Sequence, residues 1–184
     1  MTLNFRKLHR RIAPILFIPL LLSALTGIAY RLGRNWFNSP TSVSNFLMAI
    51  HQGEYLGQGL VPIYILLVGV GLLGLVATGL SMLKLKRQLS QRPSKLHHRW
   101  IHHVMAAIAF VPLTISATTG IAYRLGNAWF DLPSEQSALL LQIHQGSYLG
   151  PTLRPIYVLV VGLALIAQLV TGIQMSGILR RRPQ

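Results

Sequence analysis

The chain has 184 residues, of which 52% are hydrophobic and only three are acidic, a composition far from that of a soluble domain and typical of a membrane protein. It has no cysteine, which excludes disulfides, thiolate metal sites, covalently attached c-type haem and cysteine nucleophiles. A net charge of +14 would suit a nucleic-acid-binding protein if the basic residues covered a soluble surface. Where these residues lie along the chain decides between nucleic acid and a membrane.

Four apolar stretches without any acidic or basic residue predict four transmembrane helices. Each is close to the ~20 residues that cross a hydrocarbon core of ~30 Å. Basic residues precede the first stretch, but it is longer than the apolar core of a signal peptide, and we expect it to be retained. The predicted spans lie at about 12–30, 61–83, 104–123 and 156–179.

The basic residues are concentrated on one side of the predicted membrane. Thirteen of the 17 Lys and Arg lie in the segments 6–11, 84–99 and 180–182, while the other two connections hold the remaining four arginines and all three acids. By the positive-inside rule we expect an integral, multi-pass protein with both termini cytoplasmic, in the plasma membrane or an internal energy-converting membrane of a prokaryote. Membrane topology therefore explains the charge, and we expect lipids and no nucleic acid as partners.

An internal repeat runs through the chain at a constant offset of 93 residues. It predicts a tandem duplication of a two-span unit, with the copies related by a pseudo-two-fold axis along the membrane normal. We place the units at 1–91 and 92–184. The predicted fold class is an all-α membrane protein, a four-transmembrane-helix bundle. The matched segments are 26–33 with 119–126, 50–53 with 143–146, 62–64 with 155–157, and 78–79 with 171–172.

A short amphipathic helix is expected between the two spans of each unit, at 42–51 and 135–144. Apolar residues at 43, 46, 47 and 50 have helical spacing, which suggests a helix lying on the outer membrane surface. Aromatic pairs, Trp36-Phe37 and Trp129-Phe130, directly follow the first span of each unit and are expected to be interface anchors.

Four of the seven histidines match in pairs across the repeat. His9 corresponds to His102 at the cytoplasmic ends of the first and third spans, and His51 corresponds to His144 near the outer ends of the second and fourth. Two imidazoles that face each other across an apolar bundle core are what a b-type haem requires. We therefore expect two haem b groups per chain, with these four histidines as axial ligands of the haem iron.

Small and basic residues near the histidines fit this expectation. Glycines at both levels would leave room for a porphyrin, and arginines at both faces would pair with haem propionates. The glycines are Gly27 and Gly120 at the outer level and Gly79 and Gly172 at the inner level; the arginines are Arg31 and Arg124 outside and Arg6 and Arg99 inside.

Other roles for these residues stay open. Interface histidines can serve only as anchors or hydrogen-bond partners, the glycines can serve close helix packing, and the outer arginines can bind lipid phosphates. Met82 and Met175 also match across the repeat, either as packing residues or as axial ligands. His98 and His102, four residues apart on one helical face, could hold a transition metal without haem.

The same residues have a regular spacing in both units. His9 is followed by Pro19 and by Thr26-Gly27, and the second span is preceded by a His-Gln-Gly element at 51–53 and closes with Thr78-Gly79. The second unit repeats these elements with His102, Pro112, Thr119-Gly120, 144–146 and Thr171-Gly172.

This pattern resembles the transmembrane part of the PepSY-associated membrane family, which includes iron-regulated membrane proteins and ferric-siderophore reductases. The resemblance covers nearly the whole chain and implies haem ligation and electron transfer at the four histidines. The chain departs from the family in its outer connections, which at about 30 residues each are too short to form a PepSY domain. It is therefore expected to be the bare electron-carrying core, without a siderophore-docking platform.

The sequence thus predicts a di-haem b-type membrane cytochrome that carries electrons across the bilayer, with a quinol or a protein carrier as donor or acceptor, and with reductase activity as an open question. An alternative from a different class is a non-catalytic membrane subunit or assembly factor of a larger, pigment-binding complex. A transporter is disfavoured because no span carries an ionisable residue at mid-membrane. No acid/base pair or nucleophile is evident, so no catalytic residue is predicted.

Overall fold

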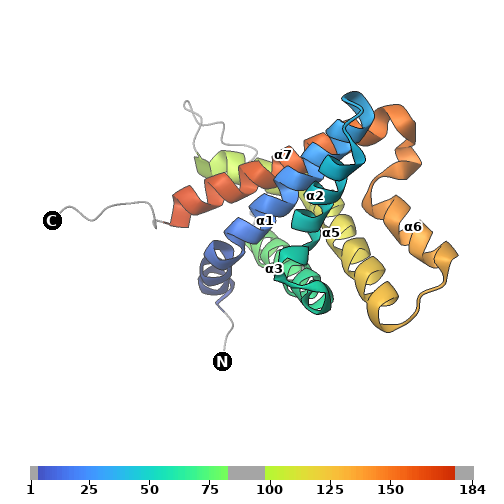
Figure 1. The fold of residues 1–184 in the computed structure, drawn as a ribbon. Coiled ribbons are helices and arrows are strands. Elements are labelled where there is room, and N and C mark those ends of the chain that lie inside the picture. The colour runs from blue at the N-terminus through green and yellow to red at the C-terminus, as the bar shows by residue number, and fades with distance from the viewer. Residues whose placement is uncertain (1–3, 83–97, 177–184) are drawn as a thin grey trace.

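The structure is a computed structural model that describes residues 4–82 and 98–176. Within these ranges the chain is almost entirely helical and contains no strand (Figure 1). The long helices are α1 (Phe5–Trp36), α3 (Val61–Ser81), α5 (His98–Trp129) and α7 (Gly150–Ser176), and the shorter ones are α2 (Thr41–Gln52) and α6 (Ser134–His144). Single 3-10 turns, η1 (Glu54–Leu56), η2 (Gln58–Leu60) and η3 (Ser147–Leu149), connect them.

The four predicted spans are confirmed as helices that are long and apolar enough to cross a membrane. α1 and α5 have 32 residues each, so they extend well beyond 12–30 and 104–123 at both ends. Hydropathy marks only the part that lies in hydrocarbon, whereas Arg and Lys continue a helix readily in water. Some predictions fall outside the described residues: the unit boundary at 91/92, His97, the basic segments 84–97 and 180–182, and the span ends at 83 and 177–179.

Each membrane helix packs against two neighbours, so the four form a closed ring in the order α1, α3, α5, α7. The helices α1 and α5 are therefore diagonal partners. The contacts between units are reciprocal: Ile28 of α1 packs on Gly162 of α7, and the matched Ile121 of α5 packs on Gly69 of α3. Such equivalent contacts are what a two-fold relation produces, and small residues let the helices approach closely.

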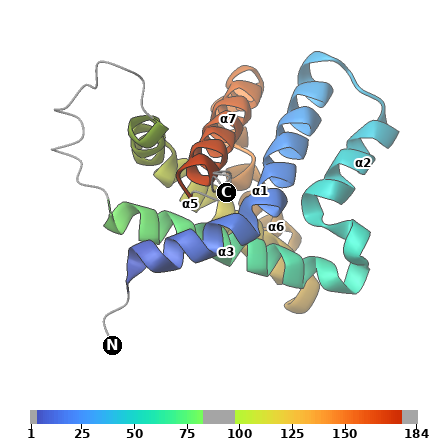
Figure 2. The ribbon, with the colours of Figure 1, turned by 90° about the vertical axis from the view of Figure 1, so that its left-hand side faces the viewer.

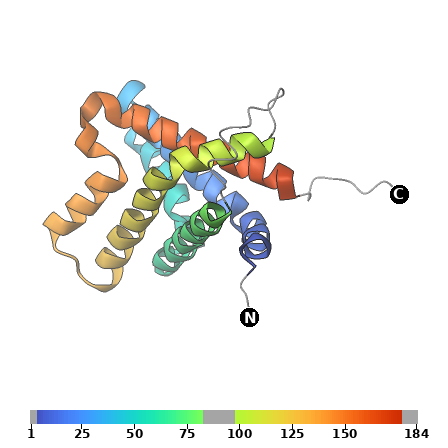
Figure 3. The same ribbon diagram turned by 180° about the vertical axis from the view of Figure 1, so that it is seen from behind.

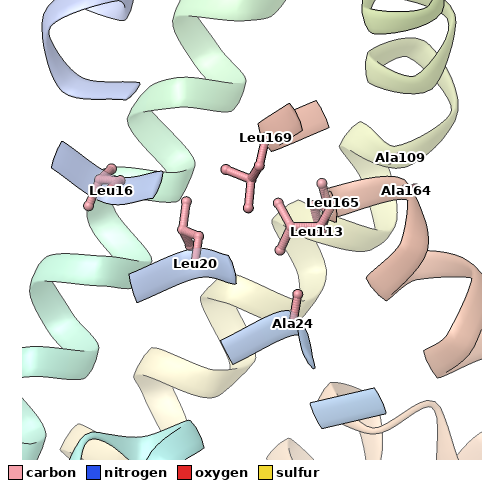
Figure 4. Close-up of a cluster of buried hydrophobic side chains, with 8 residues drawn as sticks. All are labelled: Leu16, Leu20, Ala24, Ala109, Leu113, Ala164, Leu165 and Leu169. Atoms are coloured by element: carbon pink, nitrogen blue, oxygen red, sulfur yellow. The ribbon is translucent and has the colours of Figure 1, made fainter. Parts of the chain in front are cut away.

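A cluster of buried leucines and alanines fills the middle of the bundle (Figure 4). On α1 the cluster residues Leu16 and Leu20 lie between His9 and Ser23, so the apolar core separates an inner from an outer end of the bundle. The cluster is contributed by α1, α5 and α7 and comprises Leu16, Leu20, Ala24, Ala109, Leu113, Ala164, Leu165 and Leu169.

Helices α1 and α5 are bent in their inner halves, as Figures 2 and 3 show. Pro14 and Pro19 lie inside α1, and Pro112, the match of Pro19, lies inside α5. Proline lacks the N–H that would bond to the preceding turn, and its ring displaces the carbonyl there. The bends therefore have a local cause in both units.

The two short helices form at the predicted positions and pack against the long helices of the bundle. Figure 2 shows α2 folded back beside α1, and His51 near its end contacts Ser23 of α1. The turn after α2 is made by Gly53, which has φ +76° and lies against the ring of Tyr64. A side chain at Gly53 would be strained and would clash with that ring, which explains the glycine of the His-Gln-Gly element.

Candidate functional site

The inner histidine pair faces a single apolar cavity in the bundle. His9 of α1 and His102 of α5 lie on diagonal helices, and both line the same cavity, whose walls are mostly apolar. The lining is nearly symmetric about the pseudo-two-fold axis, with Phe17 matched by Phe110 and Leu20 by Leu113. The predicted meeting of these two histidines around an apolar space is thus present.

Each inner histidine is held by a threonine of its own unit. His9 Nδ1 lies 2.8 Å from Thr78 Oγ1, and His102 Nδ1 lies 2.9 Å from Thr171 Oγ1. Both threonine hydroxyls donate their one proton to a carbonyl a turn earlier in their own helix, at 2.7 and 2.6 Å. Toward the imidazole each hydroxyl can then only accept, so Nδ1 carries the proton. The lone pair of each ring is therefore on Nε2, the nitrogen that is free to bind a metal.

The outer histidines are fixed in the same tautomer by a different kind of acceptor. His51 Nδ1 donates to the main-chain oxygen of Ser23 at 2.9 Å, and His144 Nδ1 donates to that of Ser116 at 2.8 Å. A carbonyl oxygen has no proton to give, so Nδ1 must be protonated and Nε2 again carries the lone pair. Both bonds lie within one unit, and they bring the two short helices against α1 and α5.

Burial keeps the outer histidines neutral. It lowers the pKa of His51 from 6.5 to about 4, and the charge of His144 contributes in the same direction, which indicates that the two rings are neighbours. Burial also lowers the pKa of His144, and the charge of Arg31 adds to this effect. A neutral imidazole is the form that ligates a metal.

The four glycines that were predicted to leave room for a porphyrin lie directly against the imidazoles. A Cβ at Gly27 would be 3.2 Å from His51 Cε1, and one at Gly120 would be 3.0 Å from His144 Cε1, which is tighter than ordinary contact. At the inner level, a Cβ at Gly79 or Gly172 would lie at 3.7 or 3.5 Å from the ring. Each Thr-Gly pair thus packs against one histidine. Of the four glycines, the two inner ones also line the cavity.

The two histidine levels are closer than the full membrane thickness. His9 and Ser23, which holds His51, are 14 residues apart on α1, a separation of at most about 21 Å at the helical rise of ~1.5 Å per residue. Because α2 folds back toward the bundle, this is shorter than the ~30 Å of the hydrocarbon core.

No family model, curated protein or solved structure matches this chain. The resemblance to the PepSY-associated family therefore stays a prediction.

The four arginines that were predicted to bind propionates differ in their exposure and contacts. Arg6 and Arg99 are exposed at the inner ends of α1 and α5, one turn before His9 and His102. Arg31 is buried and donates to Gln145 Oε1 of the other unit at 2.9 Å, whereas its repeat match Arg124 stays partly exposed.

Two residues near the histidines were not singled out as site residues from the sequence. Gln168 lines the inner cavity and donates from Nε2 to the carbonyl of His102 at 2.7 Å. Arg154 donates to Gln145, the residue after His144. Both could have been noticed in the sequence, because each is a polar residue whose match in the first unit is apolar: Gln168 corresponds to Leu75, and Arg154 corresponds to Val61.

The metal-clip and methionine alternatives considered from the sequence gain little from the geometry. Among the described residues no group of three or more His, Asp or Glu side chains is placed to hold a metal ion, and His98 is exposed. His103 packs edge-on against His102, with ring centroids 6.2 Å apart. Met82 and Met175, both described, do not line the inner cavity.

Proposed function

We propose that the protein is a di-haem b-type membrane cytochrome that carries electrons across the bilayer. The observation that supports this proposal best is the common state of four histidines. Each has Nδ1 bound to an acceptor, none makes a hydrogen bond through Nε2 within the described residues, and the inner two line one apolar cavity. Metal-ligating histidines characteristically donate their other ring N–H in this way. The inner and outer pairs reach this tautomer through different acceptors, so it is not a single arrangement copied by the duplication.

The residues fit a haem group at the inner level in two respects. The donor set is a pair of neutral imidazoles on diagonal helices, and the walls of the cavity between them are apolar and aromatic. His9 and His102 would hold the iron, and the exposed Arg6 and Arg99 would bind propionates at the cytoplasmic face. At the outer level His51 and His144 would be the ligands, with Arg31 and Arg124 as candidate propionate partners.

Haem, when bound, supplies one-electron redox chemistry. The contribution of this chain is to orient the ligands and to exclude water. Thr78 and Thr171 hold the inner imidazoles, and the main-chain oxygens of Ser23 and Ser116 hold the outer ones. The leucine and alanine cluster lies between the two levels and keeps the middle of the bundle dry.

The proposed cytochrome lies in a prokaryotic membrane and exchanges electrons at both faces. We place both termini in the cytoplasm of a prokaryote because the basic segments gather on that side. Electrons would be exchanged with a quinol or a protein carrier at each face. In keeping with its resemblance to the PepSY-associated family, the chain would be the electron-carrying core of such a reductase, without the extracytoplasmic domain.

The direct test is an optical spectrum of the detergent-purified protein, oxidised and then reduced with dithionite, together with quantification of haem by the pyridine haemochrome method. We expect b-type α-band absorbance on reduction and two haem groups per chain. A chain that binds no haem after expression with ample haem would contradict the proposal. A bound pigment without a redox response would favour the alternative, a pigment-binding subunit.

A further inference from the structure

Two arginines from different units converge at the outer end of the α1–α7 pair. Arg31, in the last turns of α1, donates from Nη2 to Gln145 Oε1 at 2.9 Å. Arg154, in the first turns of α7, donates from Nη2 to the same oxygen. Gln145 directly follows His144, so one amide oxygen holds two cations beside the outer histidine level.

Arg31 is buried and Arg154 is partly exposed, and neither forms an ion pair within the described residues. Only 7% of Arg31 is exposed, and among the described residues the Nε atoms of Arg31 and Arg154 are both buried without a hydrogen-bond partner. The charge that acts most strongly on Arg31 is that of Arg154, and the ring of Tyr30 lies 5.5 Å from the Arg31 guanidinium carbon. A buried guanidinium beside a like charge, with an unsatisfied Nε donor on each arginine, is costly unless an anion binds between them.

The arrangement is not repeated at the position related by the pseudo-two-fold axis. The residue that matches Arg154 in the first unit is Val61, which is fully buried. Gln52 and Arg124 match Gln145 and Arg31, so the related position has every component of the site except the second cation. The cluster is therefore a departure from the duplicated pattern.

We propose that Arg31 and Arg154 together bind one oxyanion, a carboxylate or a phosphate, at the outer end of the α1–α7 pair. Guanidinium groups with a free Nε–H present two parallel donors that match the two oxygens of such a group. The first turn of the 27-residue helix α7 adds a favourable dipole for an anion. Two sources have this chemistry: the phosphate of an outer-leaflet phospholipid, and, if the proposed function holds, a propionate of the outer haem.

The first arm of the test uses haem-free protein in dodecyl maltoside, and the probe is phosphatidylglycerol with two eight-carbon chains. Thermal unfolding is followed as the lipid is added, with inorganic phosphate in parallel. We expect a lipid-dependent rise in Tm for the wild type, and about tenfold weaker lipid affinity after Arg154→Val, because one of the two charged donors is lost. The control Arg34→Gln removes an exposed charge of α1 and should behave as wild type.

The second arm distinguishes the source of the anion. If a propionate fills the site, the lipid response disappears in haem-loaded wild type, and Arg154→Val lowers the midpoint potential of one haem while Arg34→Gln leaves both unchanged. If a phospholipid fills it, the response persists with haem bound. A response to inorganic phosphate alone that Arg154→Val removes also supports the site and identifies a free anion as its occupant.

Two results keep the proposal falsifiable. Equal lipid and phosphate responses in wild type, Arg154→Val and Arg34→Gln, together with unchanged midpoint potentials, would overturn it. If Arg154→Val does not fold, Arg154→Lys keeps the charge but not the paired donors, and it should weaken lipid binding without loss of the fold. Failure to bind haem would remove only the second arm, so the anion site and the proposed function fail separately.

Discussion

The inner and outer histidine pairs reach the same tautomer by different means. The inner imidazoles donate to threonine side chains of a membrane helix and face a cavity, whereas the outer imidazoles donate to main-chain carbonyls and are pressed against glycine. A side-chain acceptor can be removed by a single substitution, but a carbonyl acceptor cannot. The inner level therefore depends on hydrogen-bonding side chains, and the outer level depends on close packing.

The largest expected effect comes from removing the ligands of one level. His9→Leu with His102→Leu should abolish the absorbance of one haem and leave the other, and His51→Leu with His144→Leu should do the reverse. Haem quantification per chain measures this directly. His98→Leu, at an exposed histidine of α5, is the matched control and should retain both groups. Loss of haem in that control, or retention of both in the double variants, would contradict the assignment.

The second effect separates the two kinds of acceptor. Thr78→Val or Thr171→Val should weaken haem binding at the inner level by ~10–100-fold, the usual cost of losing the partner of a ligating histidine. Ser23→Ala should leave the outer level nearly unchanged, because the 2.9 Å bond from His51 goes to the main chain and the Ser23 hydroxyl lies farther away, at 3.4 Å. Haem titration of the apoprotein checks both. Thr114→Val is a control for the substitution itself, since Thr114 makes the same bond to its own helix without touching a histidine in the described structure.

A smaller effect tests packing at the outer level. Gly120→Ala should destabilise the protein by roughly 1–3 kcal/mol, as overpacking of a tight contact does, and should displace His144. Gly172→Ala, where the added Cβ would make ordinary contact with His102, should cost less. Gly74→Ala has open space and serves as the control. The free energy of unfolding in mixed micelles is the measurement, and an equal loss in all three variants would argue against the difference between the levels.

The smallest effect is a pH dependence of the haem-free protein. Because the pKa of His51 is about 4 in the folded state and 6.5 when unfolded, the unfolded chain binds the extra proton as the pH falls below about 6.5. Stability should therefore decrease between about pH 6.5 and pH 4 and be regained on return to neutral pH. His51→Leu should flatten this part of the Tm profile, whereas Thr114→Val, which removes no titratable group, should not. A profile unchanged by His51→Leu would show that other groups cause the dependence.

The sequence predicted the spans and the pairing of the histidines, because both depend on composition and on a constant offset along the chain. Apolar length located the four membrane helices, and the offset of 93 residues matched His9 with His102 and His51 with His144. It could not predict the true length of α1 and α5, since hydropathy does not register helical turns that continue outside the hydrocarbon.

The contacts of each side chain depend on the tertiary structure. Arg31 and Arg124 are equivalent positions of the repeat, yet Arg31 is buried against the opposite unit beside Arg154 and Arg124 is not. Likewise, the fold-back of α2 and the choice of Ser23 as the acceptor for His51 follow from how helices pack. A repeat determines which residues are equivalent along the chain, but the contacts between distant residues depend on packing. One substitution between the repeats, Val61 in the first and Arg154 in the second, is enough to give equivalent positions different surroundings.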